Sequence, residues 1–249
     1  MTGAPGLEAA ARAKQAVRER VWALLERERA ARFPGAQGRI PNFAGASEAA
    51  ARLASLPPWR AARVVKSNPD APQLPVRARA LADGKLLYMA VPRLVDERPF
   101  ILLDPQRLGV PSRRAASIGG AARAGRRVTV EELHPVDLVI CGSVAVNRQG
   151  ARVGKGGGFS DLELALLAEA GLIGPDTVVA TTVHPLQLLD EALPETDHDF
   201  RLDLIVAGED VITCRRTRRP PGILWEHLDA AKVAAIPALA ARAPGHTNA

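Results

Sequence analysis

The sequence has 249 residues, 47% of them hydrophobic and 24% charged, and these proportions exclude a disordered chain and a fibrous repeat. Only 4% are aromatic, which leaves little material for a nucleic-acid surface built on stacked rings, while the net charge of +6 favours anionic partners such as nucleotides. No apolar run approaches the roughly 18 residues that a membrane span needs, and the N-terminus lacks the apolar core of a signal peptide, so we expect a cytoplasmic protein without membrane contact.

The N-terminal part of the chain is predicted to be helical. Residues 7–32 are rich in Ala, Glu, Arg and Leu with apolar residues at helical spacing, which predicts one long amphipathic helix. Lys14 and Arg18 are four residues apart and therefore share a face of this helix. A Pro- and Gly-rich stretch follows, and a second helix is predicted from an N-cap at Ser47 to the residue before Pro57.

Strands and helices alternate through the rest of the chain. We predict a helix over 76–82, a loop over 105–119, a helix over 159–171, and strands over 62–66, 85–91, 100–104, 136–146, 176–183, 201–208 and, at the sheet edge, 210–214. This alternation predicts a three-layer α/β/α fold with a mainly parallel sheet. We expect a single domain over residues 1–235 and a flexible tail over 236–249, because the tail shows no apolar face.

The stretch RVGKGGGFSD, residues 152–161, has the composition of an anion-binding loop. It is not a Walker loop, because the spacing between its glycines is one residue short and Gly156 stands where Ser or Thr is required. A strand end, several glycines and a helix N-terminus nevertheless direct partial positive charge at an anion. Arg152 and Lys155 add full charges, and Asp161 is suited to the helix end or to Mg²⁺. A glycine-rich turn without a ligand remains the alternative.

Residues 137–161 resemble the signature of the 5-formyltetrahydrofolate cyclo-ligase family, which has a strand, Val-Ala-Phe-Asp, a glycine, Arg-Leu-Gly-Tyr-Gly-Gly-Gly and Tyr-Tyr-Asp. The family also begins with a helix bearing Lys-x-x-aliphatic-Arg, which Lys14 and Arg18 supply. The segment PETDHDFRLDLIV resembles its acidic-His-Asp segment, with His198 and Asp199 in place. The positions that match in the signature are Val144, Ala145, Gly150, Arg152, Gly154, Gly156, Gly157, Gly158 and Asp161.

The resemblance implies a fold like that of ribose-5-phosphate isomerase and the CoA transferases, and a reaction that depends on ATP and Mg²⁺. In the family, ATP phosphorylates the formyl oxygen of 5-formyltetrahydrofolate, N10 attacks, and loss of phosphate gives 5,10-methenyltetrahydrofolate. The implied catalytic residues are Arg152 and Asp161, with Asp161 on Mg²⁺. The implied nucleotide-binding residues are Lys14, Arg18, Gly154, Lys155, Gly156, Gly157, Gly158 and Phe159.

The chain departs from the family pattern on the substrate side. The family's Glu-x-x-Thr, which helps to hold the folate, has only Asp70 and Gln73 as counterparts. Family tyrosines or basic residues are replaced at Lys155, Phe159, Ser160 and Leu162. The altered segments resemble a divergent branch of the family that includes the eukaryotic methenyltetrahydrofolate synthetase domain-containing proteins, and a role with thiamin or another cofactor has been suggested for such paralogues.

Three functions follow in order of preference. The first is an ATP-dependent cyclo-ligase acting on 5-formyltetrahydrofolate. The second is a paralogue that keeps the nucleotide or phosphate site but acts on another cofactor precursor, such as a thiamin-related compound. The third is a basic RNA-binding module, supported only by the net charge and by RRTRR at residues 215–219, and nucleic acid is the least favoured partner. We expect a monomer or a homodimer. The dispersed histidines argue against zinc, and His184 is predicted to cap or to pack.

Overall fold

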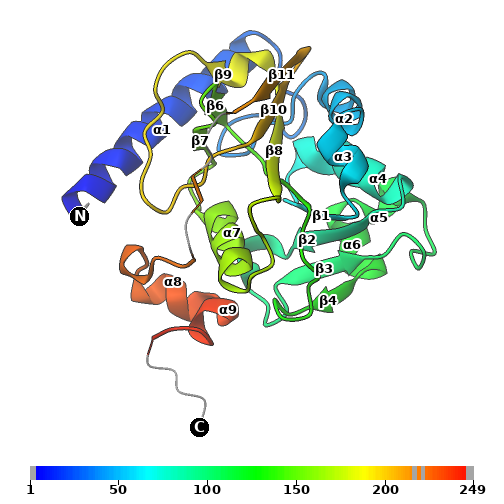
Figure 1. Ribbon diagram of the computed structural model, residues 1–249. Coiled ribbons are helices and arrows are strands. Elements are labelled where there is room, and N and C mark those ends of the chain that lie inside the picture. The colour runs from blue at the N-terminus through cyan, green and yellow to red at the C-terminus, as the bar shows by residue number, and fades with distance from the viewer. Residues whose placement is uncertain (1–3, 215–217, 220–221, 245–249) are drawn as a thin grey trace.

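The residues that this computed structural model describes, 4–214, 218–219 and 222–244, fold around two sheets (Figure 1). The larger sheet has the strand order β11-β10-β8-β5-β1-β2-β3-β4, and its inner neighbours from β10 to β2 all pair in parallel. The strands are β1 Val64–Ser67, β2 Leu86–Ala90, β3 Phe100–Leu103, β4 Arg126–Val128, β5 Leu138–Ile140, β8 Val178–Val183, β10 Leu204–Ala207 and β11 Asp210–Thr213. The predicted α/β fold with a mainly parallel sheet is confirmed, and β11 is the expected edge strand.

The smaller sheet has the order β7-β6-β9 and explains why one predicted strand is wrong. Its strands are β6 Ala145–Asn147, β7 Arg152–Val153 and β9 Leu188–Leu189. The run 136–146, predicted as one strand, contributes β5 to the large sheet and β6 to the small one. The chain changes sheets at Gly142, whose N–H donates to the side chain of Asn68 at 3.1 Å instead of to a strand. An apolar run has the same pattern whether it serves one sheet or two.

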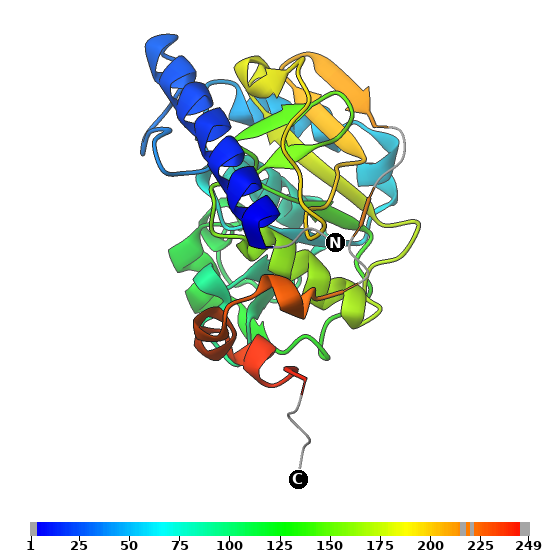
Figure 2. The ribbon, with the colours of Figure 1, turned by 90° about the vertical axis from the view of Figure 1, so that its left-hand side faces the viewer.

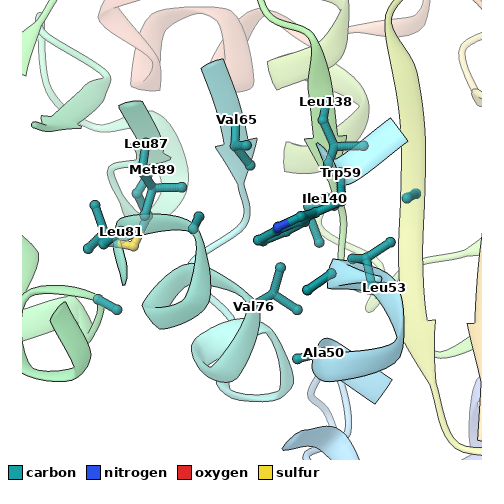
Figure 3. Packing of buried hydrophobic residues seen from close by; sticks show 14 of the residues in the cluster. Ala50, Leu53, Trp59, Val65, Val76, Leu81, Leu87, Met89, Leu138 and Ile140 are labelled. Carbon is teal, nitrogen blue, oxygen red and sulfur yellow. The ribbon is translucent and has the colours of Figure 1, made fainter. Parts of the chain in front are cut away.

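Helices cover both faces of the large sheet (Figure 1). One face carries α2 Ala46–Ala54, α3 Pro57–Ala61, α4 Leu74–Ala82, α5 Ser112–Ala115 and α6 Ile118–Ala124. Figure 3 shows their core, in which the fully buried Trp59 and Leu53 pack with Val76 against strand residues. The other face carries α7 Phe159–Glu169, α8 Ala230–Ala235 and α9 Pro237–Ala240. Short 3₁₀ turns occupy Ala71–Gln73, Pro92–Leu94, Pro185–Gln187 and Trp225–His227.

The N-terminal helix α1, Ala4–Arg27, lies across the small sheet (Figure 2). Val17, Val21 and Leu25 pack against β6 and β7 in one buried cluster, as the helical periodicity predicts. The helix ends at Arg27, earlier than predicted, and Arg29 adopts a left-handed conformation at φ 54°. Packing on the sheet therefore fixes the direction in which α1 presents Lys14 and Arg18.

Three local predictions are wrong. Gly45 in the left-handed conformation, and not Ser47, precedes α2. The predicted loop 105–119 contains α5 and the start of α6, where the Ser117 hydroxyl accepts a hydrogen bond from the Gly120 N–H at 3.0 Å. The predicted flexible tail contains instead a packed helix, α9, whose Ala238 and Leu239 are buried in the apolar cluster to which residues of α7 also belong. Periodicity does not reveal these helices, because α6 contains two glycines and the apolar stretch of α9 is too short to show a helical repeat.

The described residues include no helix that is both long and apolar enough to cross a membrane. The RRTRR segment is only partly described, because residues 215–217 lie outside the described ranges. Of its other arginines, Arg218 donates to the Thr196 carbonyl and Arg219 pairs with Asp203. These two side chains are engaged within the protein, which weakens the argument for an RNA-binding stretch.

Candidate active site

A cavity of about 290 Å³ lies where α1, the glycine-rich turn before α7 and residues 196–199 meet. We call it the main cavity, and we call residues 154–158 the glycine loop. The residues that were predicted to form the site and that line this cavity are Lys14, Arg18, Asp70, Arg152, Gly154, Lys155, Gly156, Gly157, Gly158, Phe159 and Asp161. Residues more than 140 positions apart in the sequence therefore share one cavity.

Gln73 is the predicted site residue that does not line the main cavity. Its side chain is fully buried, and neither atom of its amide group has a hydrogen-bond partner among the described residues. The turn Ala71–Gln73 contacts α2 and β8, so that Gln73 faces the interior, while Asp70 just before it reaches the cavity. The proposed substrate contact of Gln73 is therefore wrong for this structure, and Asp70 keeps its place.

The glycine loop presents a row of unpartnered backbone donors. Gly156 and Gly158 have φ values of 105° and 68°, which favour glycine over any other residue. No N–H group from residue 154 to residue 161 donates a hydrogen bond to any described residue, and the N-cap position of α7, Gly158, supplies no side-chain cap. Free N–H groups at a helix N-terminus attract anions, so the loop is built for a phosphate or a similar group.

Four cationic side chains line the main cavity beside this loop, and three of the four are paired with carboxylates. Lys14 bonds to Asp199 at 2.5 Å, Arg152 lies 3.4 Å from Asp161, and Lys155 lies 2.8 Å from Asp70. Arg18 has no carboxylate within ion-pair distance among the described residues and instead donates from Nε to the Gly154 carbonyl at 2.6 Å. Aspartates therefore neutralise most of the positive charge in the cavity.

Asp161 and Asp199 have pKa values that move in opposite directions. Burial raises the pKa of Asp161 above its usual value, the charge on Arg152 opposes this, and the charge on Asp199 adds to it. Burial would also raise the pKa of Asp199, but the ion pair with Lys14 and the hydrogen bonds from Thr196 outweigh burial and lower it. A divalent cation between these carboxylates would relieve their repulsion, and Mg²⁺ is usually held by one or two carboxylates together with phosphates. The two residues therefore fit Mg²⁺.

The lowered pKa of Asp199 predicts a pH-dependent contribution to stability. The contribution is complete above the unfolded-state pKa, about 3.9, and is lost as the pH falls through the lower folded-state value. Asp199→Asn should therefore lower the free energy of unfolding by about 1–3 kcal/mol at pH 7, measured by urea denaturation, and by much less near pH 2.5. Asp210→Asn, at an exposed ion pair, is the control, with little change at either pH. A loss that is equal at both pH values would contradict this assignment.

The main cavity is also lined by residues that the sequence analysis did not predict as ligand contacts. Thr196, His198 and Asp199 line it, and so does His227 from beyond β11. For Thr196, His198 and Asp199, the sequence did contain a signal, because His198 and Asp199 match the family's acidic-His-Asp segment. Nothing in the sequence pointed to His227, whose Nδ1 lies 2.9 Å from Nδ1 of His198.

His184 caps the turn Pro185–Gln187 by accepting from the Leu186 N–H, in agreement with its predicted structural role.

A buried polar network lies behind the cavity and joins α7 to the ends of β1 and β5. Lys66 of β1 forms an ion pair with Glu163 of α7, and both side chains are almost completely buried. Asn68 donates to the same Glu163 oxygen, Oε2, at 2.7 Å, and its own Oδ1 accepts from the Gly142 N–H at 3.1 Å. Burial raises the pKa of Glu163, and the charge on Lys66 opposes that rise. These contacts hold α7 in place against β1, and they therefore also hold the N-terminus of α7, which directly follows the glycine loop.

The sequence model of the 5-formyltetrahydrofolate cyclo-ligase family matches residues 10–208. The methenyltetrahydrofolate synthase domain-containing proteins of Mus musculus and Homo sapiens are 39% and 34% identical to the chain over 233 residues, which is 91% of it. The chain spans only 62% and 60% of the length of these two relatives. The NMR structure of Aquifex aeolicus 5,10-methenyltetrahydrofolate synthetase has a TM-score of 0.52 at 21% identity and covers 84% of this chain and 94% of that one, which supports the fold. With most of its length matched to the family model, and with Arg152, the glycine loop and Asp161 of the signature lining one cavity, the chain belongs to the 5-formyltetrahydrofolate cyclo-ligase family.

Proposed function

We propose that this chain is an ATP- and Mg²⁺-dependent cyclo-ligase that converts 5-formyltetrahydrofolate to 5,10-methenyltetrahydrofolate. The observation that carries the proposal is that the cations of α1, the glycine loop and two carboxylates line one cavity. Phosphoryl transfer needs little covalent help from the protein and depends on positioning and charge neutralisation. The cavity supplies donors and charges of the kind that such a reaction requires.

The ion pairs of the cavity suggest how the charges rearrange when the nucleotide binds. Asp161 and Asp199 would hold Mg²⁺, which supplies charge neutralisation at the phosphates. Because those aspartates are the counterions of Arg152 and Lys14, the two cations then become available to donate to phosphate oxygens. Arg18, which pairs with no carboxylate in the described part of the chain, does not need to lose a counterion before it meets a phosphate. ATP without a divalent cation should therefore bind weakly.

The chemistry that follows from this arrangement transfers the γ-phosphoryl group of ATP to the formyl oxygen. The nitrogen N10 of the folate then attacks the activated carbon and loses its proton, and the C–O bond to the phosphate breaks. ADP, phosphate and 5,10-methenyltetrahydrofolate are the products. The protein's contribution is to hold the transferred group between Lys14, Arg152 and the glycine loop while its charge is redistributed.

A second candidate function is a paralogue that binds the nucleotide but acts on another cofactor precursor. It is favoured by Gln73, which does not reach the cavity, and by Phe159 and Ser160 in place of the family tyrosines. Such a protein would bind MgATP without converting 5-formyltetrahydrofolate. The two functions therefore differ in turnover and not in nucleotide affinity.

The direct test is near-ultraviolet absorbance of methenyltetrahydrofolate with purified protein, MgATP and 5-formyltetrahydrofolate. We expect a rise in absorbance that requires both ATP and Mg²⁺, matched by release of ADP, and suppressed by EDTA. Lys14→Met should reduce the rate by at least tenfold, because a charge-assisted bond to phosphate contributes about 1.5–3 kcal/mol. MgATP binding without any rise would reject the cyclo-ligase and leave the paralogue. The exposed Arg107→Met serves as a control of equal charge change.

A further inference from the structure

The C-terminal segment, residues 222–244, begins after residue 208, where the match to the family model ends. It packs on α7, the helix that follows the glycine loop, and Figures 1 and 2 both show α8 and α9 against that side of the molecule. Ile223, Ile236 and Leu239 are buried in one cluster with Leu162 and other apolar residues of α7. The segment is thus held beside the site by an apolar contact of its own.

Two side chains of this segment reach the site. His227 lines the main cavity and meets His198. Lys232 donates from Nζ to the Gly157 carbonyl at 3.2 Å and lies 5.8 Å from the centre of the Phe159 ring. A Cβ atom at Gly158 would lie 3.0 Å from the same Nζ. The ammonium group of Lys232 is therefore in direct contact with the backbone of the glycine loop.

Lys232 is itself held in place by its own helix. Its backbone N–H donates to Asp229 Oδ1 at 2.6 Å, which caps α8. No carboxylate of the described residues is within ion-pair distance of its Nζ. The hydrogen bond to the Gly157 carbonyl is thus the principal polar contact of this ammonium group.

The contact with Gly157 orients the following amide. In a trans peptide the carbonyl and the N–H of the next residue point in opposite directions, so a Gly157 carbonyl aimed at Lys232 directs the Gly158 N–H away from Lys232. Lys232 lines a second cavity of about 60 Å³ between α7 and the C-terminal segment but not the main cavity, whereas Gly158 lines both. The Gly158 N–H, which has no partner among the described residues, therefore points away from Lys232, and Gly158 itself lines the main cavity.

We propose that Lys232 is a positioning residue for polyphosphate binding, which fixes the Gly157–Gly158 peptide so that the Gly158 N–H meets a phosphate oxygen. The C-terminal segment then forms one side of the nucleotide site, although this segment lies outside residues 10–208, which the family model matches. The ligand class is the polyphosphate of a nucleotide. The proposal rests on the nucleotide-binding part of the proposed function and not on cyclo-ligase turnover.

The test compares Lys232→Met, which keeps the aliphatic stem, with Lys232→Arg, which keeps the charge and the donors. Calorimetric titration with MgATP and, separately, with inorganic tripolyphosphate and Mg²⁺ should show about tenfold weaker binding for Lys232→Met and near wild-type binding for Lys232→Arg. Arg113→Met, an exposed cation of α5 on the other face of the sheet, is the matched control and should bind as the wild type does. Hydrogen exchange at the Leu162 N–H, which donates to the Gly158 carbonyl at 3.0 Å, should become faster without ligand only in Lys232→Met, because release of the Gly157–Gly158 peptide loosens this turn.

The outcomes separate this inference from the proposed reaction. Wild-type affinity and unchanged exchange at the Leu162 N–H in Lys232→Met would overturn the role of Lys232. An arginine variant as weak as the methionine variant would also overturn it, because the guanidinium supplies the same charge to the carbonyl. Wild-type protein that binds neither probe would overturn the inference together with the nucleotide site. Tight MgATP binding that depends on Lys232, without folate turnover, would support the inference and reject only the cyclo-ligase.

Discussion

Asp161→Asn is expected to lower kcat/KM of the cyclo-ligase reaction by about 10²–10³-fold, a typical loss when one group that stabilises transition-state charge is removed. Asp161 stands in the first turn of α7, beside Arg152 and electrostatically coupled to Asp199. The asparagine keeps the shape of the side chain but removes half of the charge that the two carboxylates offer to Mg²⁺. The rate should be measured by methenyltetrahydrofolate absorbance over a range of Mg²⁺ concentrations, where the variant should need more metal.

Binding measurements distinguish the loss of a metal ligand from a structural defect. In Asp161→Asn, Arg152 loses its counterion, so affinity for ATP in EDTA should stay the same or increase, while affinity for MgATP falls. A misfolded site would lose both affinities. Asp176→Asn, an exposed position, is the control and should change neither. Full activity of Asp161→Asn at low Mg²⁺ would remove Asp161 from the metal site.

The sequence predicted the fold where local pattern and tertiary role coincide. Continuous apolar runs such as 138–140 and 178–183 become buried parallel strands, because both faces of such a sheet are covered by helices. The prediction failed at Gly142, where the backbone N–H donates to the Asn68 side chain instead of to a neighbouring strand, and the chain passes to a second sheet. That contact joins residues 74 positions apart, and no local pattern records it.

The residues of the candidate site also fall into those that the sequence predicted and those that it missed. Lys14, Arg18 and the glycine loop were found from spacing and from the family signature, because those residues act together in recognisable motifs. The predictions missed His227, which lines the main cavity, and Lys232, which contacts the glycine loop. Both reach this region because the C-terminal segment packs on α7. Gln73 was misplaced for a related reason: its neighbour Asp70 faces the cavity, and the intervening turn reverses the direction of the side chain.

The buried ion pair between Lys66 of β1 and Glu163 of α7 is also a contact between distant parts of the chain, and breaking it is expected to have the largest effect on stability. Lys66→Met leaves Glu163 almost fully buried without its counterion, and breaking a buried ion pair from one side costs about 3–5 kcal/mol. We expect the free energy of unfolding, from urea denaturation at pH 7, to fall by about that amount. Lys66→Met combined with Glu163→Gln should recover most of the loss, because the amide oxygen still accepts from Asn68 and carries no charge.

The pH dependence of this loss identifies its cause. Burial raises the pKa of Glu163, and without the opposing charge of Lys66 the folded-state value should rise further above the unfolded value of about 4.3. Folding of Lys66→Met then takes up a proton, so its stability should fall as the pH rises from about 4 through the folded-state pKa. The deficit relative to the wild type should accordingly be small near pH 4 and large at pH 7. A deficit that is independent of pH, or that persists in the double variant, would assign the loss to packing at β1 and not to the uncompensated carboxylate.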